Sequence, residues 1–349
     1  MERVPDDNGE HARCRLCGLE GRHISAALGV CRSCIREQPD ASIRLTETAH
    51  ARMRKTDGLP AQPPDDGSVH CTICANGCAI GYGEAGYCGL RENVRDLLIE
   101  RQGIVRTQYV SAPGACPGAS SCDAEGYSLN VFVYGCSFDC LYCPHPEHRH
   151  LDEVKRLGIP TLQQLARQAA CIRFYGGAPG PQLPFLLEVT ERVLEQATPR
   201  ICWELNGSAA PDLTRRATQH AAASGGTVTM QIMARDAMLH RALTGRGNQR
   251  TLASFEMLSG DFGASVLAAA TPLVPGYIDA DEVAAIAMFI ASCNPDISYR
   301  LLPVEPGSAS RDLPPTSDEQ AEACRAAAAK YLNRVHICRP ASAGVKNLL

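Results

Sequence analysis

Cysteine is the residue type that carries most of the possible chemistry in this sequence. Eighteen cysteines occur among 349 residues, and thirteen of them precede residue 144. Eleven of these form three tight groups: Cys14, Cys17, Cys31 and Cys34; Cys71, Cys74, Cys78 and Cys88; and Cys136, Cys140 and Cys143. The first ten residues, MERVPDDNGE, lack the apolar core of a signal peptide, so we expect a cytoplasmic, reducing environment. Cysteines at this density there indicate metal or redox chemistry rather than disulfides.

The third group has the spacing C-x3-C-x2-C, within VYGCSFDCLYCPH, directly after an apolar run. Three thiolates at this spacing suit a [4Fe–4S] cluster whose fourth iron is free for a ligand that is not protein. The alternative is a zinc knuckle whose fourth ligand is His145 or His148. The HPEHRH stretch that holds these histidines, residues 145–150, is expected to be a solvated loop.

The first group, C-x2-C-x13-C-x2-C, has the pattern of a zinc ribbon or of rubredoxin, and we expect zinc there, with mononuclear iron as the alternative. The second group, C-x2-C-x3-C-x9-C, fits either tetrahedral zinc or an auxiliary [4Fe–4S] cluster, and its spacing does not separate them. Cys116 and Cys122 form a looser pair that could line the site, replace a ligand or remain reduced loop thiols.

The elements that must position the third group alternate along the chain. Short apolar runs are separated by segments of helical character, and this alternation predicts a parallel α/β sheet, open and doubly wound or closed into a partial barrel. Because parallel strands are covered on both faces, we expect both faces to be apolar. The runs span residues 129–135, 171–177, 200–207, 227–233, 265–274 and 297–304.

Composition divides the chain before that region. We expect a four-cysteine module at 1–38, a helical segment and proline-rich linker at 39–68, a second cysteine segment at 69–127 and the α/β core at 128–340. No run is long and apolar enough to span a bilayer. Lys and Arg number 34 against 38 Asp and Glu, a net charge of −4 that does not favour nucleic-acid binding.

The C-x3-C-x2-C motif after the first strand, with Tyr142 before its last cysteine, resembles the radical S-adenosylmethionine (radical SAM) superfamily. The resemblance implies a partial (β/α)6 barrel of the TIM type. It also implies that Cys136, Cys140 and Cys143 hold a [4Fe–4S] cluster. There the cluster reductively cleaves S-adenosylmethionine to a 5′-deoxyadenosyl radical, which abstracts hydrogen from a substrate. An electron donor such as flavodoxin or ferredoxin is implied with it.

Cofactor contacts follow from the same resemblance. Tyr142 is expected near the adenine. Gly176, Gly177, Ala178 and Pro179 stand where the family often has GGEP, and Ala178 replaces its acidic residue, so a contact there would use main-chain carbonyls. Within WELNG, Glu204 or Asn206 could bind the ribose or amino-acid part of the cofactor, or either could be structural. The branch usually has Asp and Lys where this chain has Gln231 and Met233.

Further segments resemble one branch of the superfamily. HRALTG (240–245) and residues 271–306 resemble pyruvate formate-lyase activating enzymes, and residues 71–97 resemble the radical proteins that accompany AmmeMemo proteins. This branch implies a protein or peptide substrate. A small molecule or RNA is the alternative substrate, and a non-catalytic iron–sulfur and zinc protein is the third hypothesis.

Overall fold

The structure is a computed structural model that describes residues 12–111, 127–305 and 307–339. Its largest element is an eight-stranded sheet in the order β14-β13-β12-β11-β10-β9-β8-β7. The neighbours from β8 to β14 are all parallel, and β7 is antiparallel to β8 at one edge. The strands of this sheet are β7 Val105–Ser111, β8 Tyr127–Val133, β9 Ala169–Gly176, β10 Arg200–Leu205, β11 Val228–Gln231, β12 Leu267–Leu273, β13 Ser298–Pro303 and β14 Val335–Ile337.

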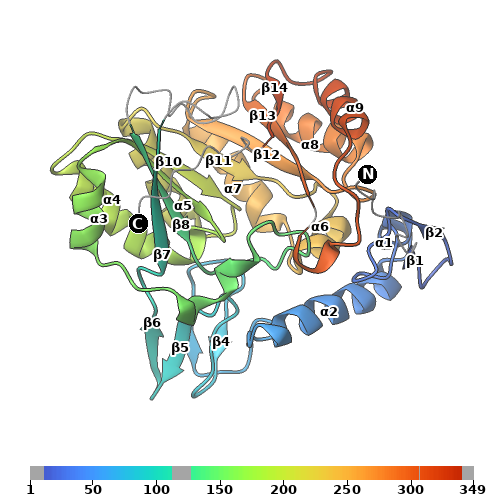
Figure 1. Ribbon diagram of the computed structural model, residues 1–349, viewed down its shortest axis with the longest axis horizontal. Coiled ribbons are helices and arrows are strands. Elements are labelled where there is room, and N and C mark those ends of the chain that lie inside the picture. Colours follow the sequence, from blue (N-terminus) through green and yellow to red (C-terminus); the bar gives the residue numbers. More distant parts are fainter. Residues whose placement is uncertain (1–11, 112–126, 306, 340–349) are drawn as a thin grey trace, which may run out of the picture.

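The helices follow the strands as the alternation predicted. Six of them contact one another in chain order, α3 with α4, then α5, α7, α8 and α9, and so form the outer layer of a partial barrel (Figure 1). The described helices are α1 Arg32–Glu37, α2 Pro39–Thr56, α3 Ile159–Ala166, α4 Leu183–Leu194, α5 Pro211–Ala223, α6 Ala237–Thr244, α7 Gln249–Asp261, α8 Ala280–Cys293 and α9 Asp318–Ala328, and the 3₁₀ turns are η1 Pro146–Arg149, η2 Leu151–Glu153, η3 Gly180–Gln182 and η4 Ser308–Ser310. The predicted α/β fold class, with a large parallel sheet and a four-cysteine module before it, is confirmed.

The outer face of the sheet forms the apolar core. Strand pairing places Val131 beside Phe174, and Phe174 beside Trp203, on this face. Phe174 and Trp203 stack with ring centroids 4.2 Å apart, and both are buried. Because side chains alternate between the faces of a strand, each strand puts every second residue into this layer.

The inner face differs from our expectation, because it carries polar and charged side chains beside apolar ones such as Phe132. The strand register pairs Asn130 with Arg173, and one step nearer the carboxyl end it pairs Glu204 with Thr229. One further step along, Gln231 pairs with Ala270, and Ala270 pairs with Arg300. Since the sheet curves into a partial barrel, this face looks into the barrel and not onto a helix layer, so it need not be apolar.

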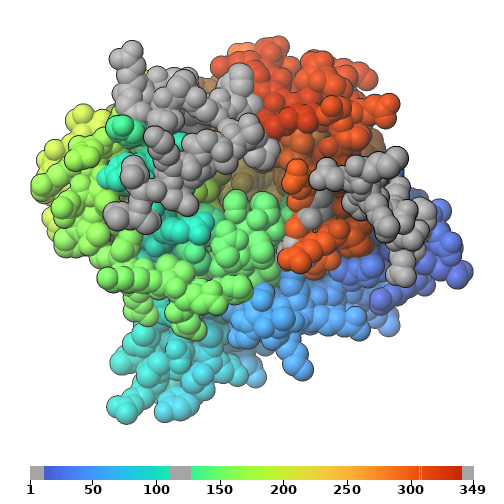
Figure 2. Space-filling model, viewed as in Figure 1, coloured from blue at the N-terminus to red at the C-terminus, as the bar shows by residue number. Residues whose placement is uncertain are grey.

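The N-terminal residues make three two-stranded sheets and a long helix outside the barrel. Their strands are β1 Ala12–Arg13, β2 Glu20–Gly21, β3 Val69–His70, β4 Ala79–Ile80, β5 Arg91–Val94 and β6 Leu97–Glu100. Helix α2 connects the first cysteine group to the second, and in Figure 1 it runs along the lower side of the barrel. In Figure 2 its blue residues lie directly against the green segment that follows β8.

Candidate functional site

The loop after β8 carries the three cysteines of the C-x3-C-x2-C motif. It starts at the carboxyl end of the strand, where active sites of parallel α/β folds gather. Cys136, Cys140 and Cys143 are each partly exposed. Burial, with a smaller contribution from the charge of Cys143, raises the pKa of Cys136 to about 12. Burial, followed by the charges of the other two thiols, also raises the pKa of Cys140. The three cysteines therefore lie together on the loop that leaves β8.

Their spacing tests which metal group fits. In the part of the chain that the structure describes, the three sulfur atoms do not all lie within 4.8 Å of one another. That is too wide for three ligands of a single ion, because two sulfurs on one tetrahedral zinc are about 3.8 Å apart at a Zn–S distance of about 2.3 Å. A four-iron cluster fits, since each thiolate then binds a different iron.

Backbone hydrogen bonds hold this loop, residues 134–145, in place, and we call it the cluster loop. Gly135 has a φ of 80°, in the left-handed region that glycine adopts without strain, and a β-carbon there would lie 2.5 Å from a methyl carbon of Leu90. Within the loop, Asp139 N donates to Thr244 O at 2.9 Å and Leu141 N donates to Leu243 O at 3.1 Å. The HRALTG segment therefore supports the cluster loop through the end of α6.

A buried carboxylate inside the loop anchors it to α2. Asp139 is fully buried, and its carboxylate lies 3.1 Å from His50 Nδ1, 3.4 Å from Arg54 Nη1 and 3.2 Å from Arg149 Nη2. Burial alone would raise the pKa of Asp139, but the hydrogen bond from His50 and the charges of Arg54 and Arg149 lower it. The carboxylate is thus ionised and paired within the fold.

The Gly176–Pro179 turn packs directly on the cluster loop. Gly177 N donates to Val133 O at 2.9 Å, and Ala178 N donates to Gly135 O at 3.0 Å. These two N–H groups are used by the loop, and Pro179 O accepts from Gln182 N at 2.9 Å. A β-carbon on Gly177 would lie 2.5 Å from Gly135 O and 2.8 Å from the His148 side chain. The close approach requires glycine here.

The two polar residues of WELNG have different surroundings. Asn206 Nδ2 donates to Ser137 Oγ at 2.9 Å and lies 3.9 Å from Cys136 Sγ. Glu204 instead accepts a hydrogen bond from Arg173 on the polar inner face. Burial opposes the ionisation of Glu204, but the charges of Arg173 and Arg300 lower its pKa. Asn206 therefore belongs to the cluster loop, and Glu204 to a charged group on the barrel wall.

Tyr142 is almost fully buried, and its hydroxyl donates to Met233 Sδ at 3.1 Å. Met233 follows β11, and its sulfur is the hydrogen-bond acceptor for the Tyr142 hydroxyl. Burial raises the pKa of the Tyr142 hydroxyl well above its usual value. The hydroxyl is a neutral donor here.

The first cysteine group forms a compact site. The sulfur atoms of Cys14, Cys17, Cys31 and Cys34 all lie within 4.8 Å of one another, and the Cys17 and Cys31 sulfurs are 3.8 Å apart. Burial opposes ionisation of Cys14, but backbone N–H groups, including that of Cys31 at 3.4 Å, lower its pKa to about 6. The donor set fits one tetrahedral metal ion.

This module docks onto the barrel. Arg32 forms ion pairs with Asp279 and Asp281 at the start of α8. The Tyr277 hydroxyl accepts from Ser25 N and donates to Val30 O, both at 2.9 Å. The module therefore covers the loop that leaves the carboxyl end of β12.

The second cysteine group also gathers. Burial, then the charge of Cys88, with smaller contributions from Cys71 and Cys78, raise the pKa of Cys74 to about 12. Tyr87 N donates to Cys78 Sγ at 3.4 Å, and Cys71 N donates to Cys78 O at 2.8 Å. Cys116 and Cys122 lie outside the described residues.

One part of the HPEHRH expectation is wrong. Residues 146–149 form η1, and His148 and Arg149 are buried, because Gly135 N donates to His148 O at 2.8 Å and Arg149 reaches Asp139. Burial lowers the pKa of His148 to about 3. His145 and His150 are exposed as expected, with side chains 43% and 47% accessible.

The functional residues that sequence reasoning missed are the charged partners. His50 and Arg54 lie on α2, and Arg173 and Arg300 lie in strands expected to be apolar. The signal available was a single charge within each of two apolar runs, CIRFYGG and ISYRLLPV. The sequence gives no comparable signal for His50 and Arg54, because their partner Asp139 is more than 80 residues away along the chain.

A family profile described as a 4Fe-4S single cluster domain matches residues 122–251, which include the third cysteine group. The isethionate sulfite-lyase activating enzyme of Desulfovibrio desulfuricans is 29% identical over 188 residues, which are 54% of this chain and 54% of that protein. The predicted similarity to the radical SAM superfamily is confirmed. The chain thus spans about half the length of the curated relative that it matches.

Solved structures give partial matches to this radical SAM-like chain. A domain of pyruvate-formate lyase-activating enzyme from Bacteroides vulgatus matches with a TM-score of 0.41 at 18% identity, over 48% of this chain and 98% of that one. Streptococcus suis SuiB bound to S-adenosylmethionine matches with a TM-score of 0.44 at 13% identity, over 60% and 48%.

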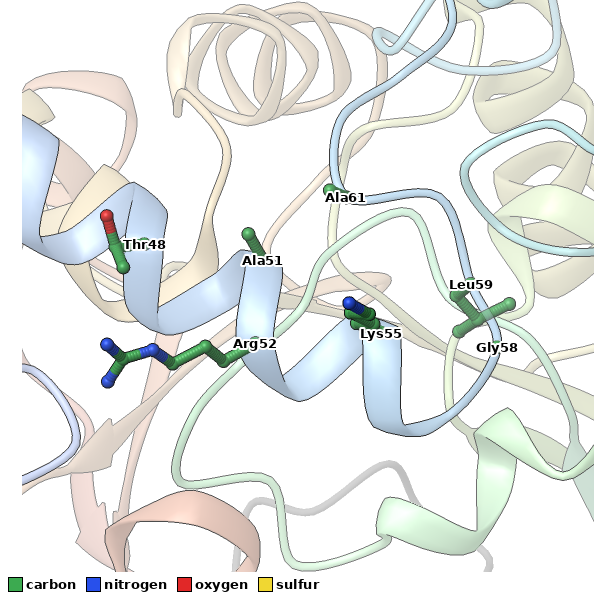
Figure 3. A pocket seen from close by; sticks show the side chains of 7 residues that line it. All are labelled: Thr48, Ala51, Arg52, Lys55, Gly58, Leu59 and Ala61. Atoms are coloured by element: carbon green, nitrogen blue, oxygen red, sulfur yellow. The ribbon is translucent and has the colours of Figure 1, made fainter.

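A surface depression of about 510 Å³ lies beside α2. Its lining comes from α2 and from the linker after it, with Arg52 and Lys55 among the side chains (Figure 3). The lining contains no cysteine, histidine or carboxylate, so it offers no further candidate for catalysis. Within the described residues, no helix has the length and apolar character needed to cross a membrane.

Proposed function

We propose that this protein is a radical SAM enzyme that acts on a protein or peptide. The observation that carries the proposal is the placement of the third cysteine group. The three cysteines lie on the loop at the carboxyl end of β8, and their sulfur atoms do not all lie within 4.8 Å of one another, which is wider than the site of a single ion. The similarity to an activating enzyme supports a macromolecular substrate.

In the proposal, Cys136, Cys140 and Cys143 hold a [4Fe–4S] cluster, and metal also binds at the two upstream four-cysteine groups. Such a cluster supplies reductive cleavage of S-adenosylmethionine to a 5′-deoxyadenosyl radical, which abstracts hydrogen from the substrate. A flavodoxin or ferredoxin is the proposed electron donor, and the reducing cytoplasm the proposed location, because the thiols must stay reduced to bind metal.

The chain's own residues would orient this cluster. Asn206 places its amide at Ser137 and near Cys136 Sγ, where an N–H donor stabilises negative charge on sulfur. Asp139 ties the loop between the first two cysteines to α2. The Gly177 and Ala178 N–H groups hold the other side of the loop. Tyr142 and the carbonyl groups of residues 176–179 remain proposed contacts of S-adenosylmethionine. Glu204, on the inner face of the barrel, remains a proposed contact of the same cofactor.

The first test is cofactor cleavage. Anaerobically reconstituted, reduced protein should convert S-adenosylmethionine to 5′-deoxyadenosine, measured by chromatography. Cys136→Ala, Cys140→Ala and Cys143→Ala should each abolish this conversion while zinc content stays unchanged. Cys293→Ala, at a partly exposed cysteine outside all three groups, is the matched control and should keep full activity. The absence of cleavage in protein with a complete cluster would reject the proposal.

The second test identifies the class of substrate. Extract of the source cells grown in deuterated medium is separated into macromolecular and small-molecule fractions. The proposal expects deuterium in 5′-deoxyadenosine only with the macromolecular fraction, and expects protease treatment to abolish it. Sensitivity to ribonuclease instead would indicate RNA, and transfer from the small-molecule fraction would indicate a small substrate. Either result would reject the protein or peptide substrate.

A further inference from the structure

The two upstream cysteine groups differ in how far apart their sulfur atoms lie. In the first group all four sulfurs lie within 4.8 Å of one another, and the Cys17–Cys31 distance is 3.8 Å. That distance equals the edge expected for a zinc tetrahedron, which is about 3.8 Å for Zn–S bonds of about 2.3 Å. The first group therefore has the size of a single-ion site.

The second group is wider although it has the same number of thiols. Cys71 N donates to Cys78 O at 2.8 Å, and Tyr87 N, one residue before Cys88, donates to Cys78 Sγ at 3.4 Å, so the turns that carry these cysteines meet. Yet among the described residues no three of these sulfurs lie mutually within 4.8 Å. A tetrahedral zinc site would bring all four within that distance, as it does in the first group.

The surrounding chain fixes the backbone of the second group. The strand pair β3 and β4 connects Cys71 to Cys78 through a 2.8 Å hydrogen bond, while Cys74 pairs with Ala209 beyond the end of β10. Cys71 and Cys78 therefore lie at the end of one strand pair, whereas Cys74 lies on a turn that is held against the barrel.

We propose that Cys71, Cys74, Cys78 and Cys88 bind a second [4Fe–4S] cluster, whereas Cys14, Cys17, Cys31 and Cys34 bind a single zinc ion. A four-iron cluster needs wider thiol spacing because each thiolate binds a different iron, and all four irons then have a protein ligand. This inference goes beyond the proposed function, because it does not depend on the cleavage of S-adenosylmethionine.

The position of the second group gives the cluster a neighbour. Cys88 O would lie 3.4 Å from a β-carbon on Gly135, the residue before Cys136. Asn76 Nδ2 donates to Ser137 O at 2.9 Å, and Ala75 N donates to Ser208 O at 2.8 Å. The two cysteine loops are thus in direct contact. A cluster bound in the second would supply a one-electron redox centre beside the first.

The experiment is metal and sulfide analysis with Mössbauer and EPR spectroscopy on anaerobically reconstituted, full-length protein. The inference expects about eight irons and about one zinc per chain, since each cubane holds four irons. The triple variant Cys136→Ala/Cys140→Ala/Cys143→Ala should keep about four irons. Its reduced-state EPR signal should not change when S-adenosylmethionine is added. Cys71→Ala/Cys74→Ala should keep the other four irons.

Cys14→Ala/Cys17→Ala is the matched variant for the compact site, and it should lose zinc and keep all iron. If the triple variant holds no iron and the chain holds two zinc ions, the inference is wrong even when cofactor cleavage by the wild type succeeds. Conversely, a second cluster in a protein that does not cleave the cofactor would uphold the inference and reject the proposed function. Because a variant can fail to fold, the iron count and the zinc-edge X-ray absorption of wild-type protein provide an independent test. Two zinc ions and four irons there would overturn the inference.

Discussion

His50 Nδ1 lies 3.1 Å from Asp139 Oδ2, and this contact joins helix α2 to the middle of the cluster loop. The other ring nitrogen, Nε2, lies 3.0 Å from Ala242 O. Both ring nitrogens therefore lie within hydrogen-bond distance of oxygen atoms on other segments of the chain. Through His50 and Arg54, α2 connects the first cysteine group to the loop that carries the third. A segment outside the barrel thus supports its reactive loop.

Asp139→Asn tests this connection. The substitution leaves the buried guanidinium groups of Arg54 and Arg149 without their carboxylate, and we expect a loss of about 3–5 kcal/mol of stability. Anaerobic urea unfolding measures the loss, and iron content should fall with it. Glu322→Gln, at an exposed pair with Arg325, should cost no more than about 1 kcal/mol. Equal midpoints for the two variants would show that the buried pair does not support the loop.

Asn206→Ala tests the amide beside Cys136. Removing this donor leaves Ser137 Oγ and Cys136 Sγ without their shared N–H partner. We expect cofactor cleavage to fall roughly tenfold, the lower range for loss of an outer partner of a metal ligand, and the cluster potential to become more negative. Potentiometric EPR measures the second effect. Thr227→Ala removes a hydroxyl 3.9 Å from Cys202 Sγ, away from the cluster loop, and should leave the potential unchanged.

Gly177→Ala tests the close contact between the 176–179 turn and the cluster loop. The added β-carbon would lie 2.5 Å from Gly135 O, so the loop must shift. We expect a loss of about 1–3 kcal/mol, as for overpacking of a tight interior, together with a weaker cluster signal. Gly158→Ala is the control, since its nearest contact is an ordinary 3.7 Å from Pro160. A neutral Gly177→Ala variant would mean that the turn moves freely.

Arg36→Ala tests the docking of the first cysteine module. Arg36 pairs with the fully buried carboxylate of Glu282 at 3.2 Å and with Asp236 at 3.3 Å. We expect amide hydrogen exchange in α1 to accelerate severalfold while exchange in β12 stays unchanged, because only the interface is weakened. Arg44→Ala, at an exposed position of α2, should change neither. Faster exchange in β12 would show instead that the whole barrel is affected.

His240 makes stability depend on pH. It is fully buried beside Phe138, its Nδ1 lies 2.7 Å from Arg246 O, and burial lowers its pKa to about 4. Below pH 6.5 the unfolded imidazole takes a proton that the folded one refuses until about pH 4, so stability falls as the pH drops through this window. The loss is about 2 kcal/mol at pH 5. His240→Asn keeps a donor and does not titrate, so its unfolding midpoint should change less between about pH 7 and about pH 5.

The sequence alone determined the features that depend on local order. Cysteine spacing predicted where metal ligands occur, and alternating periodicity predicted six parallel strands with helices between them. The cluster motif could be placed at the end of the first of these strands because both lie in one short segment. Such features depend on residues that are close in the chain, so their signals survive without a structure.

Only the tertiary structure decided the relationships between distant segments. The pairing of Asp139 with α2 spans 89 residues in the case of His50. The polar inner face depends on strand register, which brings Arg173 and Glu204 together from different strands. The sulfur spacing that separates the two four-cysteine groups depends on how the turns around them pack, and spacing in sequence does not specify it. Contacts between distant segments determine the Asp139 pairing, the strand register and the sulfur spacing, because the local sequence is compatible with many different packings of these segments.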